Sequence, residues 1–179
     1  MVLGATMFVF DVELADADRG VYQKLALRVA RHPSESDDHL VARVLAWCLE
    51  FTEGIAFSRG LAEPDEPAIA IRDLTGLLTT WIDIGAPDPA RLHRASKSAA
   101  RVVVYTHKDA TQLAARLRGA RIHRLEQLEL HAFDREFIAA VAARLQRRMS
   151  FSLTVSERQL YLSMDGSDFS STIERISLP

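Results

Sequence analysis

The 179-residue sequence contains a single cysteine, Cys48, so an intrachain disulfide and a zinc site built from cysteines are both excluded. No apolar segment is long enough to span a membrane, and no charged stretch followed by an apolar run opens the chain as a secretory leader would. We therefore expect a cytoplasmic protein. Repeats, low-complexity tracts and long linkers are also absent, which predicts one domain over residues 1–179.

An excess of positive charge is missing too, because 22 basic residues stand against 24 acidic ones and the formal net charge is −2. This balance argues against a generally basic nucleic-acid binder but leaves room for local basic patches. Hydrophobic residues make up 48% and charged residues 26% of the chain. Such a composition is typical of a globular protein with a substantial core and not of a disordered one.

Several catalytic signatures are lacking as well. There is no glycine-rich motif that could cradle a phosphate, and no serine in a nucleophile-elbow pattern after a strand. The histidines do not have the spacing of zinc ligands, and His39 has no partner four residues further on. Cys48 lies among Ala46, Trp47, Leu49 and Phe51, which indicates a packed core residue and not a nucleophile.

The first third of the chain predicts two strands followed by a helix. Alternation over Thr6–Leu14 and over 25–30 is typical of strands, with a turn at 16–20 between them. Ser34–Asp37 has the spacing of a capping box and should begin the helix. Its buried face is expected to consist of residues at helical spacing, namely Leu40, Val44, Trp47 and Phe51.

The middle of the chain predicts strand, turn, strand, helix and strand. Their expected bounds are Ala68–Arg72, Asp73–Gly76, Leu77–Ile84, Asp88–Ala100 and Val102–Tyr105. A short strand over Ile55–Arg59 and a loop over 60–67 come before them. After Ser34 the elements therefore follow the order α-β-β-β-α-β.

The last third predicts two capped helices and a closing set of strands. Asp109 should cap a helix through Leu117 that ends at Gly119, and Asp134 should cap another. Strands are expected at 128–133, 151–155, 160–163 and 172–178. The sequence as a whole indicates an α/β fold.

The turn at Asp73–Gly76 allows the pairing of the hairpin to be worked out. If Asp73 faces Gly76, counting outward places Glu66 opposite Asp83, and a bulge at Gly76 would shift the match by one, towards Asp65. Opposed residues have Cβ atoms about 4.5–5.5 Å apart. Two carboxylates that close repel each other unless a proton or a cation lies between them, and Mg²⁺ favours such oxygen ligands.

Several motifs, in this order, resemble the YaeQ family of bacterial proteins. They are the opening strand pair, Ala30–Glu35, Phe57–Leu61, Asp65–Pro67 and Trp81–Asp88, and the resemblance covers the whole chain. That family is similar in fold to the restriction-endonuclease-like PD-(D/E)xK superfamily. The resemblance implies an α-β-β-β-α-β core with a mixed sheet, extended by the N-terminal strand pair and the C-terminal strands.

The resemblance also implies roles for particular residues. Asp65 or Glu66 fits the first acid of the superfamily and Asp83 the second, while Glu35 on the first helix could add a further metal ligand or simply stabilise the helix N-terminus. Gly85 stands where the superfamily has a lysine. The following helix offers Arg91, Arg94 and Lys97 in its place, either to hold phosphate or as a solvated basic face.

Two functions follow as hypotheses. The first is an Mg²⁺- or Mn²⁺-dependent phosphodiesterase acting on nucleic acid, with the metal on Asp83 and on Glu66 or Asp65. The second is a non-catalytic module of the same fold that binds nucleic acid or a protein partner, which the glycine in the lysine position favours. Asp73 lies at the far end of the hairpin, roughly 20 Å from the level of Asp83, and is assigned to the turn.

Overall fold

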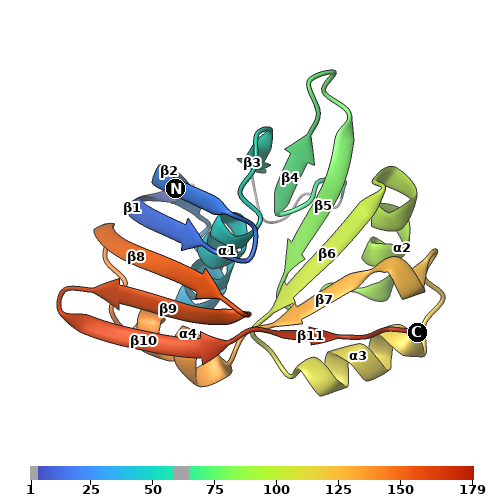
Figure 1. Cartoon of the computed structure of the whole chain (residues 1–179). Coiled ribbons are helices and arrows are strands. Elements are labelled where there is room, and N and C mark those ends of the chain that lie inside the picture. The colour runs from blue at the N-terminus through green and yellow to red at the C-terminus, as the bar shows by residue number, and fades with distance from the viewer. Residues whose placement is uncertain (1–3, 59–64) are drawn as a thin grey trace.

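The computed structural model describes residues 4–58 and 65–179 and contains two separate β-sheets (Figure 1). The first sheet has the order β10-β9-β8-β1-β2. Its strands are β1 (Thr6–Asp16), β2 (Val21–Arg31), β8 (Arg148–Ser156), β9 (Gln159–Met164) and β10 (Ser167–Thr172). β1 runs antiparallel to β2 and parallel to β8, so the C-terminal strands assemble on the N-terminal pair.

The second sheet has the order β11-β7-β6-β5-β4-β3. Its strands are β3 (Ile55–Phe57), β4 (Ile69–Arg72), β5 (Leu78–Ile84), β6 (Arg101–Thr106), β7 (Glu129–Ala132) and β11 (Glu174–Ile176). β3, β4 and β5 pair antiparallel, and β6 is parallel to β5. The predicted order α-β-β-β-α-β is confirmed. The N-terminal and C-terminal strands, however, build a sheet of their own beside this core.

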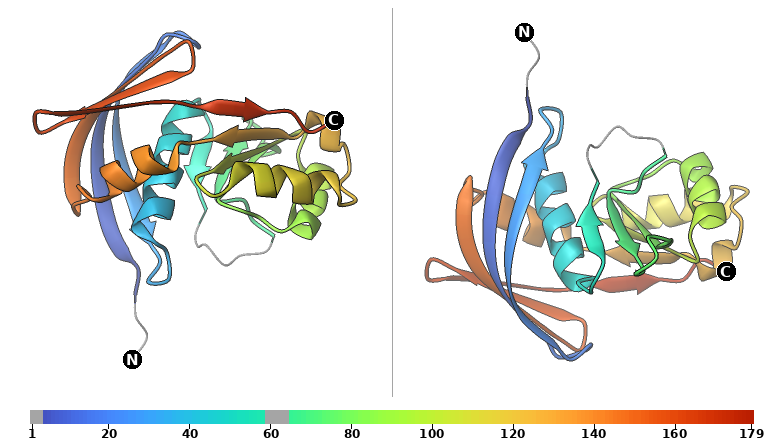
Figure 2. Two further views of the ribbon diagram at one scale, coloured as in Figure 1. Left: turned by 90° about the horizontal axis from the view of Figure 1, so that it is seen from below. Right: turned by 90° about the horizontal axis from the view of Figure 1, so that it is seen from above.

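The helices form layers around the second sheet. α1 (Asp37–Leu49) lies between the two sheets with α4 (Arg135–Ala142) beside it, whereas α2 (Pro89–Ser98) and α3 (Ala110–Arg118) cover the other face of the second sheet (Figure 2). A 3-10 turn, η1 (Leu125–Gln127), precedes β7. Two apolar clusters separate the layers, one around α1 and one under α2 and α3. No helix in the described ranges is long and apolar enough to cross a membrane.

α1 is buried on every side because both sheets pack against it. The Ser36 side chain accepts a hydrogen bond from the backbone N–H of His39, so Ser36, and not Ser34, caps the helix. All ten residues from Leu40 to Leu49 are buried, as expected for the predicted face but extending far beyond it. Phe51 lies outside the helix, which is capped at Glu50. Because α1 is packed on all sides, the side chains of its first turn are held in fixed positions.

The predicted closing strand over 172–178 is wrong, since it corresponds to the end of β10 and to β11, which belong to different sheets. Ile173 lies between them and is 4% exposed. Its backbone N–H donates to Arg158 O at 2.9 Å, which takes it out of both strand ladders. Burial of this side chain in the core therefore turns the chain from one sheet into the other.

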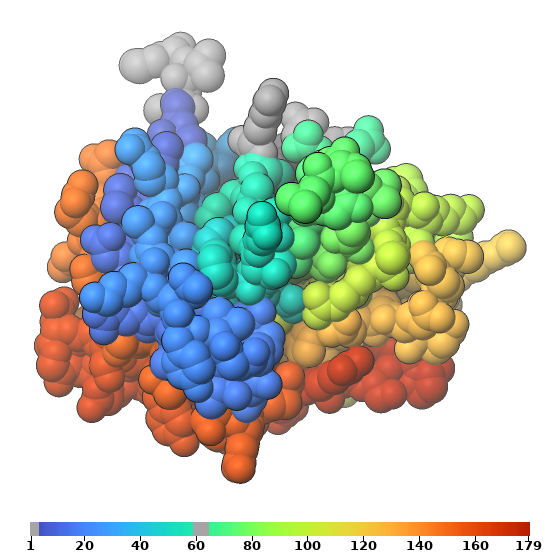
Figure 3. All heavy atoms as spheres, turned by 45° about the horizontal axis from the view of Figure 1, so that its top comes forward, coloured from blue at the N-terminus to red at the C-terminus, as the bar shows by residue number. Residues whose placement is uncertain are grey.

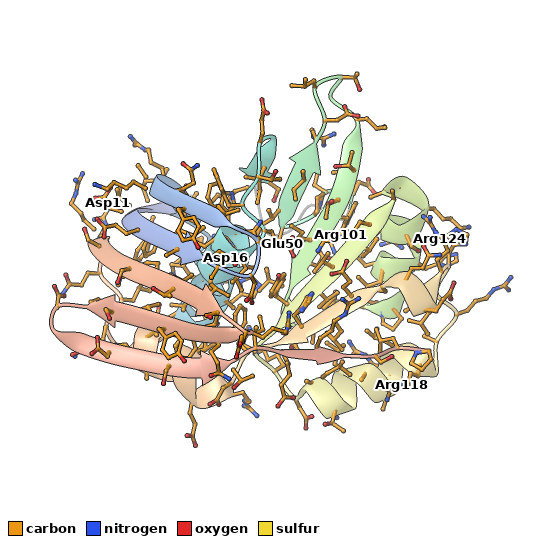
Figure 4. The ribbon with its side chains drawn as sticks, viewed as in Figure 1. Asp11, Asp16, Glu50, Arg101, Arg118 and Arg124 are labelled. Carbon is orange, nitrogen blue, oxygen red and sulfur yellow. The ribbon has the colours of Figure 1, made fainter. Side chains whose placement is uncertain are left out.

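A network of charged residues joins β6 and β7 of the second sheet to the C-terminal end of α1. Arg101 donates to both carboxylate oxygens of Glu129, at 2.6 and 3.0 Å, and to both of Glu50, at 2.9 and 3.2 Å (Figure 4 labels Glu50 and Arg101). Tyr105 also donates to Glu50, at 2.7 Å. Burial and the negative charge of Glu50 raise the pKa of the Tyr105 hydroxyl, which therefore stays protonated as a donor.

Candidate functional site

The Gly76 N–H donates to Asp73 O at 2.9 Å, which confirms the predicted turn over Asp73–Gly76. The Asp73 N–H donates to Leu77 O at 3.0 Å, so Asp73 pairs with Leu77, and Gly76, whose φ is +88°, forms the bulge that was the alternative to pairing with Gly76. The Asp73 carboxylate accepts hydrogen bonds from the backbone N–H groups of Thr75 and Leu77, which confirms its assignment to the turn. A second irregularity, a bulge between Ile71 and Arg72, shifts the register again.

These two shifts move the acids relative to each other. Ile69 lies opposite Ile82, which places Ala68 level with Asp83, and the Ala68 N–H approaches Asp83 Oδ1 at 3.4 Å. The prediction that Glu66 lies opposite Asp83 is therefore wrong. The alternative, a bulge that moves the match towards Asp65, is also wrong, because the match moves the other way along the chain, to Ala68. Each irregularity adds one residue to the strand that follows the turn and so moves the match towards Ala68. The sequence indicates the first one, at Gly76, but not the second.

Asp83 is a buried acid with a basic partner. It is 3% exposed, and its Oδ2 and Oδ1 accept from Arg91 Nε and Nη2 at 2.7 and 3.0 Å. Arg91 comes from α2, where it lies over the Trp81 ring at 5.2 Å, and it also donates to Glu66 O at 2.6 Å. The guanidinium thus ties α2 to β5 and to the segment that enters β4.

Glu35 is the second buried acid, 4% exposed, just before α1. Its carboxylate accepts from Arg43 Nε and Nη2 at 3.0 and 2.9 Å, and it lies 2.5 Å from His39 Nδ1. Burial alone would raise the pKa of Glu35, but the hydrogen bonds and charges of His39 and Arg43 outweigh it and lower the pKa. Glu35 is therefore an ionised acceptor at neutral pH.

Both acids line one pocket of about 530 Å³, which we call the α1–β5 pocket. Its polar lining residues are Ser34, Glu35, Ser36, His39, Glu66, Asp83, Arg91 and Lys108. The structure thus brings together three of the acids singled out in the sequence. Asp65 is exposed and lies outside this lining.

The donor set in the α1–β5 pocket does not fit a divalent cation as it stands. Both oxygens of Asp83 are engaged by Arg91, and both oxygens of Glu35 by Arg43 and His39. Across residues 4–58 and 65–179, no three histidine, cysteine or acidic side chains lie close enough to share an ion. A guanidinium already provides the positive charge that Mg²⁺ or Mn²⁺ would bring to Asp83.

The lysine that was expected at the position of Gly85 could not be placed there without strain. Its φ is +90°, a backbone conformation that side-chain-bearing residues rarely adopt. A Cβ added there would lie 3.6 Å from His39 Cδ2, in ordinary contact. The backbone conformation, and not lack of space, therefore favours glycine. The lysine that does line the pocket is Lys108, which follows β6.

The three basic residues of α2 do not act on one site. Lys97 follows Arg91 by six residues, so the two side chains point about 120° apart around the helix axis. Arg91 accordingly lines the α1–β5 pocket, whereas Arg94 and Lys97 line a separate groove of about 690 Å³. We call this the α2 groove; it is lined by Ala90, His93, Arg94, Lys97, Arg121, Ile122 and His123.

The α2 groove lies in the most basic part of the chain. Residues 89–124 contain nine of the 22 basic residues and only one of the 24 acidic ones. Figure 3 shows α2, in yellow-green, beside the segment 119–127. Arg118 and Arg124, labelled in Figure 4, donate to the backbone carbonyls of Ser177 and Ser96 and meet no carboxylate there. Their charge is thus not cancelled locally.

Three residues in or beside the α1–β5 pocket were not identified from the sequence, namely His39, Arg43 and Lys108. His39 was compared only with histidines further along the chain, whereas its partner Glu35 lies four residues before it. Glu35, His39 and Arg43 follow one another at intervals of four, the spacing that puts side chains on one side of a helix. That spacing was a usable signal. The sequence contains no comparable signal for Lys108, because the position of this residue depends on how β6 pairs with β5.

Comparison with known proteins agrees with this fold. A family model described as YaeQ protein matches residues 1–173. The uncharacterised protein YaeQ of Escherichia coli strain K12 is 32% identical over 166 residues, which cover 92% of each chain.

Crystal structures of YaeQ proteins superpose on nearly the whole molecule. The one from Xanthomonas axonopodis pv. citri has a TM-score of 0.86 at 30% identity and covers 98% of this chain and 99% of its own. The one from Pseudomonas syringae has a TM-score of 0.90 at 27% identity and covers 97% and 96%. Sequence and structure agree that the chain belongs to the YaeQ family.

Proposed function

We propose that this protein is a nucleic-acid-binding module that holds the phosphate backbone in the α2 groove. The observation that carries the proposal is the concentration of positive charge in residues 89–124 of a chain whose net charge is −2. Contacts with phosphates supply most non-specific affinity for nucleic acids, and they come mainly from arginine and lysine. A local basic surface is sufficient for that purpose, even on an acidic protein.

The charges around the groove support this assignment. Arg94, Lys97 and Arg121 are exposed, and none of the seven lining residues is acidic. Partial burial, together with the charges of Lys97, His123 and Arg121, lowers the pKa of His93. The neighbouring basic side chains add to the effect of burial on His93, and together they form a positive surface that would attract a polyanion.

The test removes three charges from the groove. We expect Arg94→Ala with Lys97→Ala and Arg121→Ala to weaken binding of a fluorescent single-stranded oligonucleotide, measured by anisotropy. Each lost phosphate contact should also reduce the slope of log affinity against log salt by about one. Duplex DNA and RNA probes of equal length would show which nucleic acid is preferred.

A matched control removes three charges elsewhere. Lys24, Arg28 and Arg148 are exposed on the first sheet, so their triple alanine variant has the same net charge as the groove variant. Equal weakening by both variants would mean that only net charge matters and would overturn the proposal. No binding by the unaltered protein would overturn it too, and would favour a protein partner for the module.

Metal-dependent phosphodiester hydrolysis is the second candidate function, as the resemblance to PD-(D/E)xK nucleases implies. The observation that favours it is that Glu66 and Asp83 line one pocket. Because Arg91 occupies Asp83, we expect weak calorimetric binding of Mn²⁺ by the unaltered protein and tighter binding by Arg91→Gln. Adding Asp83→Asn should abolish the gain. If Arg91→Gln binds no Mn²⁺, this candidate fails.

A further inference from the structure

His39 is held in one orientation by a buried carboxylate. Its Nδ1 lies 2.5 Å from Glu35 Oε2, and Arg43 holds the same carboxylate through two further hydrogen bonds. An ionised carboxylate can only accept, so Nδ1 must carry the proton. The lone pair of the neutral ring is then on Nε2, as in a histidine that a carboxylate prepares to act as a general base.

The second ring nitrogen of His39 is available to a ligand. Nε2 makes no hydrogen bond to residues 4–58 or 65–179, and it is not among the buried atoms that lack a partner. The His39 side chain is 24% exposed and lines the α1–β5 pocket. The imidazole is thus fixed at one end and open to the pocket at the other.

A second histidine, His107, is buried and packs against His39. The His107 ring packs edge-on against His39 with centroids 5.9 Å apart, and it is 4% exposed. Both of its ring nitrogens are buried without a hydrogen-bond partner in the described part of the chain. Burial and the charge of Lys108 lower its pKa to about 4, so it is neutral at pH 7. Buried polar atoms left unpaired are rare, and the other two in the described part of the chain are the indole nitrogens of Trp47 and Trp81.

Positive side chains complete the pocket. Arg91 and Lys108 line it together with His39, and Lys108 is exposed. Because Arg91 is paired with Asp83, an anionic group that entered would find the ammonium group of Lys108 to offset its charge. The pocket therefore combines a prepared base with a cationic group suited to a phosphate.

From this arrangement we propose that the α1–β5 pocket hydrolyses phosphodiesters without a metal ion, with His39 as the general base and Glu35 as its positioning residue. The proposal goes beyond nucleic-acid binding, because it concerns a different pocket and different residues from the α2 groove. It also departs from the second candidate function, since it needs no cation on Asp83.

The proposed step uses water as the nucleophile. His39 Nε2 accepts a proton from a water molecule while the water oxygen forms a bond to phosphorus. The bond from phosphorus to the leaving oxygen breaks, and its electron pair stays on that oxygen. A phosphomonoester and an alkoxide or phenolate are formed. An alkoxide takes a proton from solvent water and becomes an alcohol, and the proton on His39 returns to solvent.

Charged groups on several elements face this base. Glu35, just before the N-cap of α1, bonds His39 and is itself held by Arg43 of α1. His107 and Lys108 approach from the end of β6. Asp83 and Arg91 line the same pocket as a pair, and Glu66 adds a further carboxylate.

The test measures hydrolysis of bis(p-nitrophenyl) phosphate with EDTA present. Because a general base contributes roughly 100- to 10,000-fold, we expect His39→Ala to reduce the rate at least 100-fold. Added imidazole should restore part of this rate, which a purely structural role of His39 would not allow. Glu35→Gln should lower kcat and leave KM unchanged. His39→Gln provides a second variant if the alanine protein does not fold.

The matched control is His32→Ala, an exposed histidine that does not line the pocket and should leave the rate unchanged. Absence of EDTA-resistant hydrolysis by the unaltered protein overturns the proposal. So does hydrolysis that persists in His39→Ala, or a loss that imidazole cannot restore. Oligonucleotide binding measured on the same proteins separates these outcomes from failure of the α2 groove proposal.

Discussion

The guanidinium of Arg91 holds the carboxylate of Asp83 through two hydrogen bonds, of 2.7 Å from Nε and 3.0 Å from Nη2. The residue expected to bind phosphate and the residue expected to bind metal are thus each other's partner. The carboxylate side chain is 4% exposed and the arginine side chain 21%. Such a shielded pair has consequences for stability that can be measured.

Removing Arg91 should destabilise the protein strongly. Arg91→Ala leaves the Asp83 carboxylate buried without its partner, and breaking a buried pair in this way costs about 3–5 kcal/mol. Urea denaturation at neutral pH measures the loss. The double variant Arg91→Ala with Asp83→Asn should recover part of it, because no charge remains buried. A loss below about 1 kcal/mol in Arg91→Ala would show that the pair is solvated and not shielded.

Glu129 should make stability fall in acid. Burial alone would raise its pKa, but hydrogen bonds from His131 and Arg101 outweigh this and lower the pKa to about 2, from an ordinary 4.5. A carboxyl group with a depressed folded pKa contributes full stability above its unfolded pKa and loses it as pH falls through the folded value. The contribution of Glu129 is therefore lost between about pH 4.5 and pH 2.

Urea midpoints at a series of pH values from 6 down to 2 test this prediction. We expect Glu129→Gln to be less stable than the unaltered protein at pH 6, because Arg101 loses one of its two carboxylates. The difference between the two proteins should shrink as pH falls through this range. A difference that stays constant with pH would contradict the prediction.

His107 should lower stability as pH falls below neutrality. Its folded pKa of about 4 lies below the ordinary 6.5, so the unfolded chain binds the proton more readily and folding weakens between those values. His107→Leu also removes two buried nitrogens that lack partners. Unpaired buried polar groups cost about 1–3 kcal/mol, so we expect stabilisation of that order, larger at pH 5 than at pH 8. Destabilisation at both values would mean that the ring nitrogens do have partners.

Cys48 should be unreactive in the folded protein. It is fully buried, and burial raises the pKa of its thiol to about 12. Since the thiolate is the reactive form, labelling by Ellman's reagent at pH 8 should require opening of the core. We expect the labelling rate to rise with urea in parallel with unfolding. Rapid labelling of the native protein would show that α1 leaves its position between the sheets without global unfolding.

Local sequence patterns predicted most of the elements. The helix caps Asp88, Asp109 and Asp134 lie where expected, because a side-chain acceptor before the first turn is a local requirement. The core order also followed from local signals, since hydrophobic period and turn residues are visible within short windows. The strand over 167–172 was missed apart from its last residue, because its serines and aspartate carry no alternating apolar pattern.

The candidate site was predicted only in part. Glu35, Glu66 and Asp83 do line one pocket, but their charged partners were not foreseen. Arg43 pairs with Glu35 at helical spacing, a local relationship that the sequence contains. Arg91 pairs with Asp83 because α2 packs back on β5, which no local pattern specifies.

The sequence by itself determined the order of helices and strands, their caps and the burial of residues such as Cys48, because each depends on neighbours along the chain. Only the tertiary structure decided that β1, β2, β8, β9 and β10 form a sheet separate from the core strands. It also decided that two bulges bring Ala68 and not Glu66 level with Asp83, and that α2 divides its basic residues between two surfaces. Register and packing depend on contacts between segments far apart in sequence. Side-chain charges can only pair after those contacts have formed.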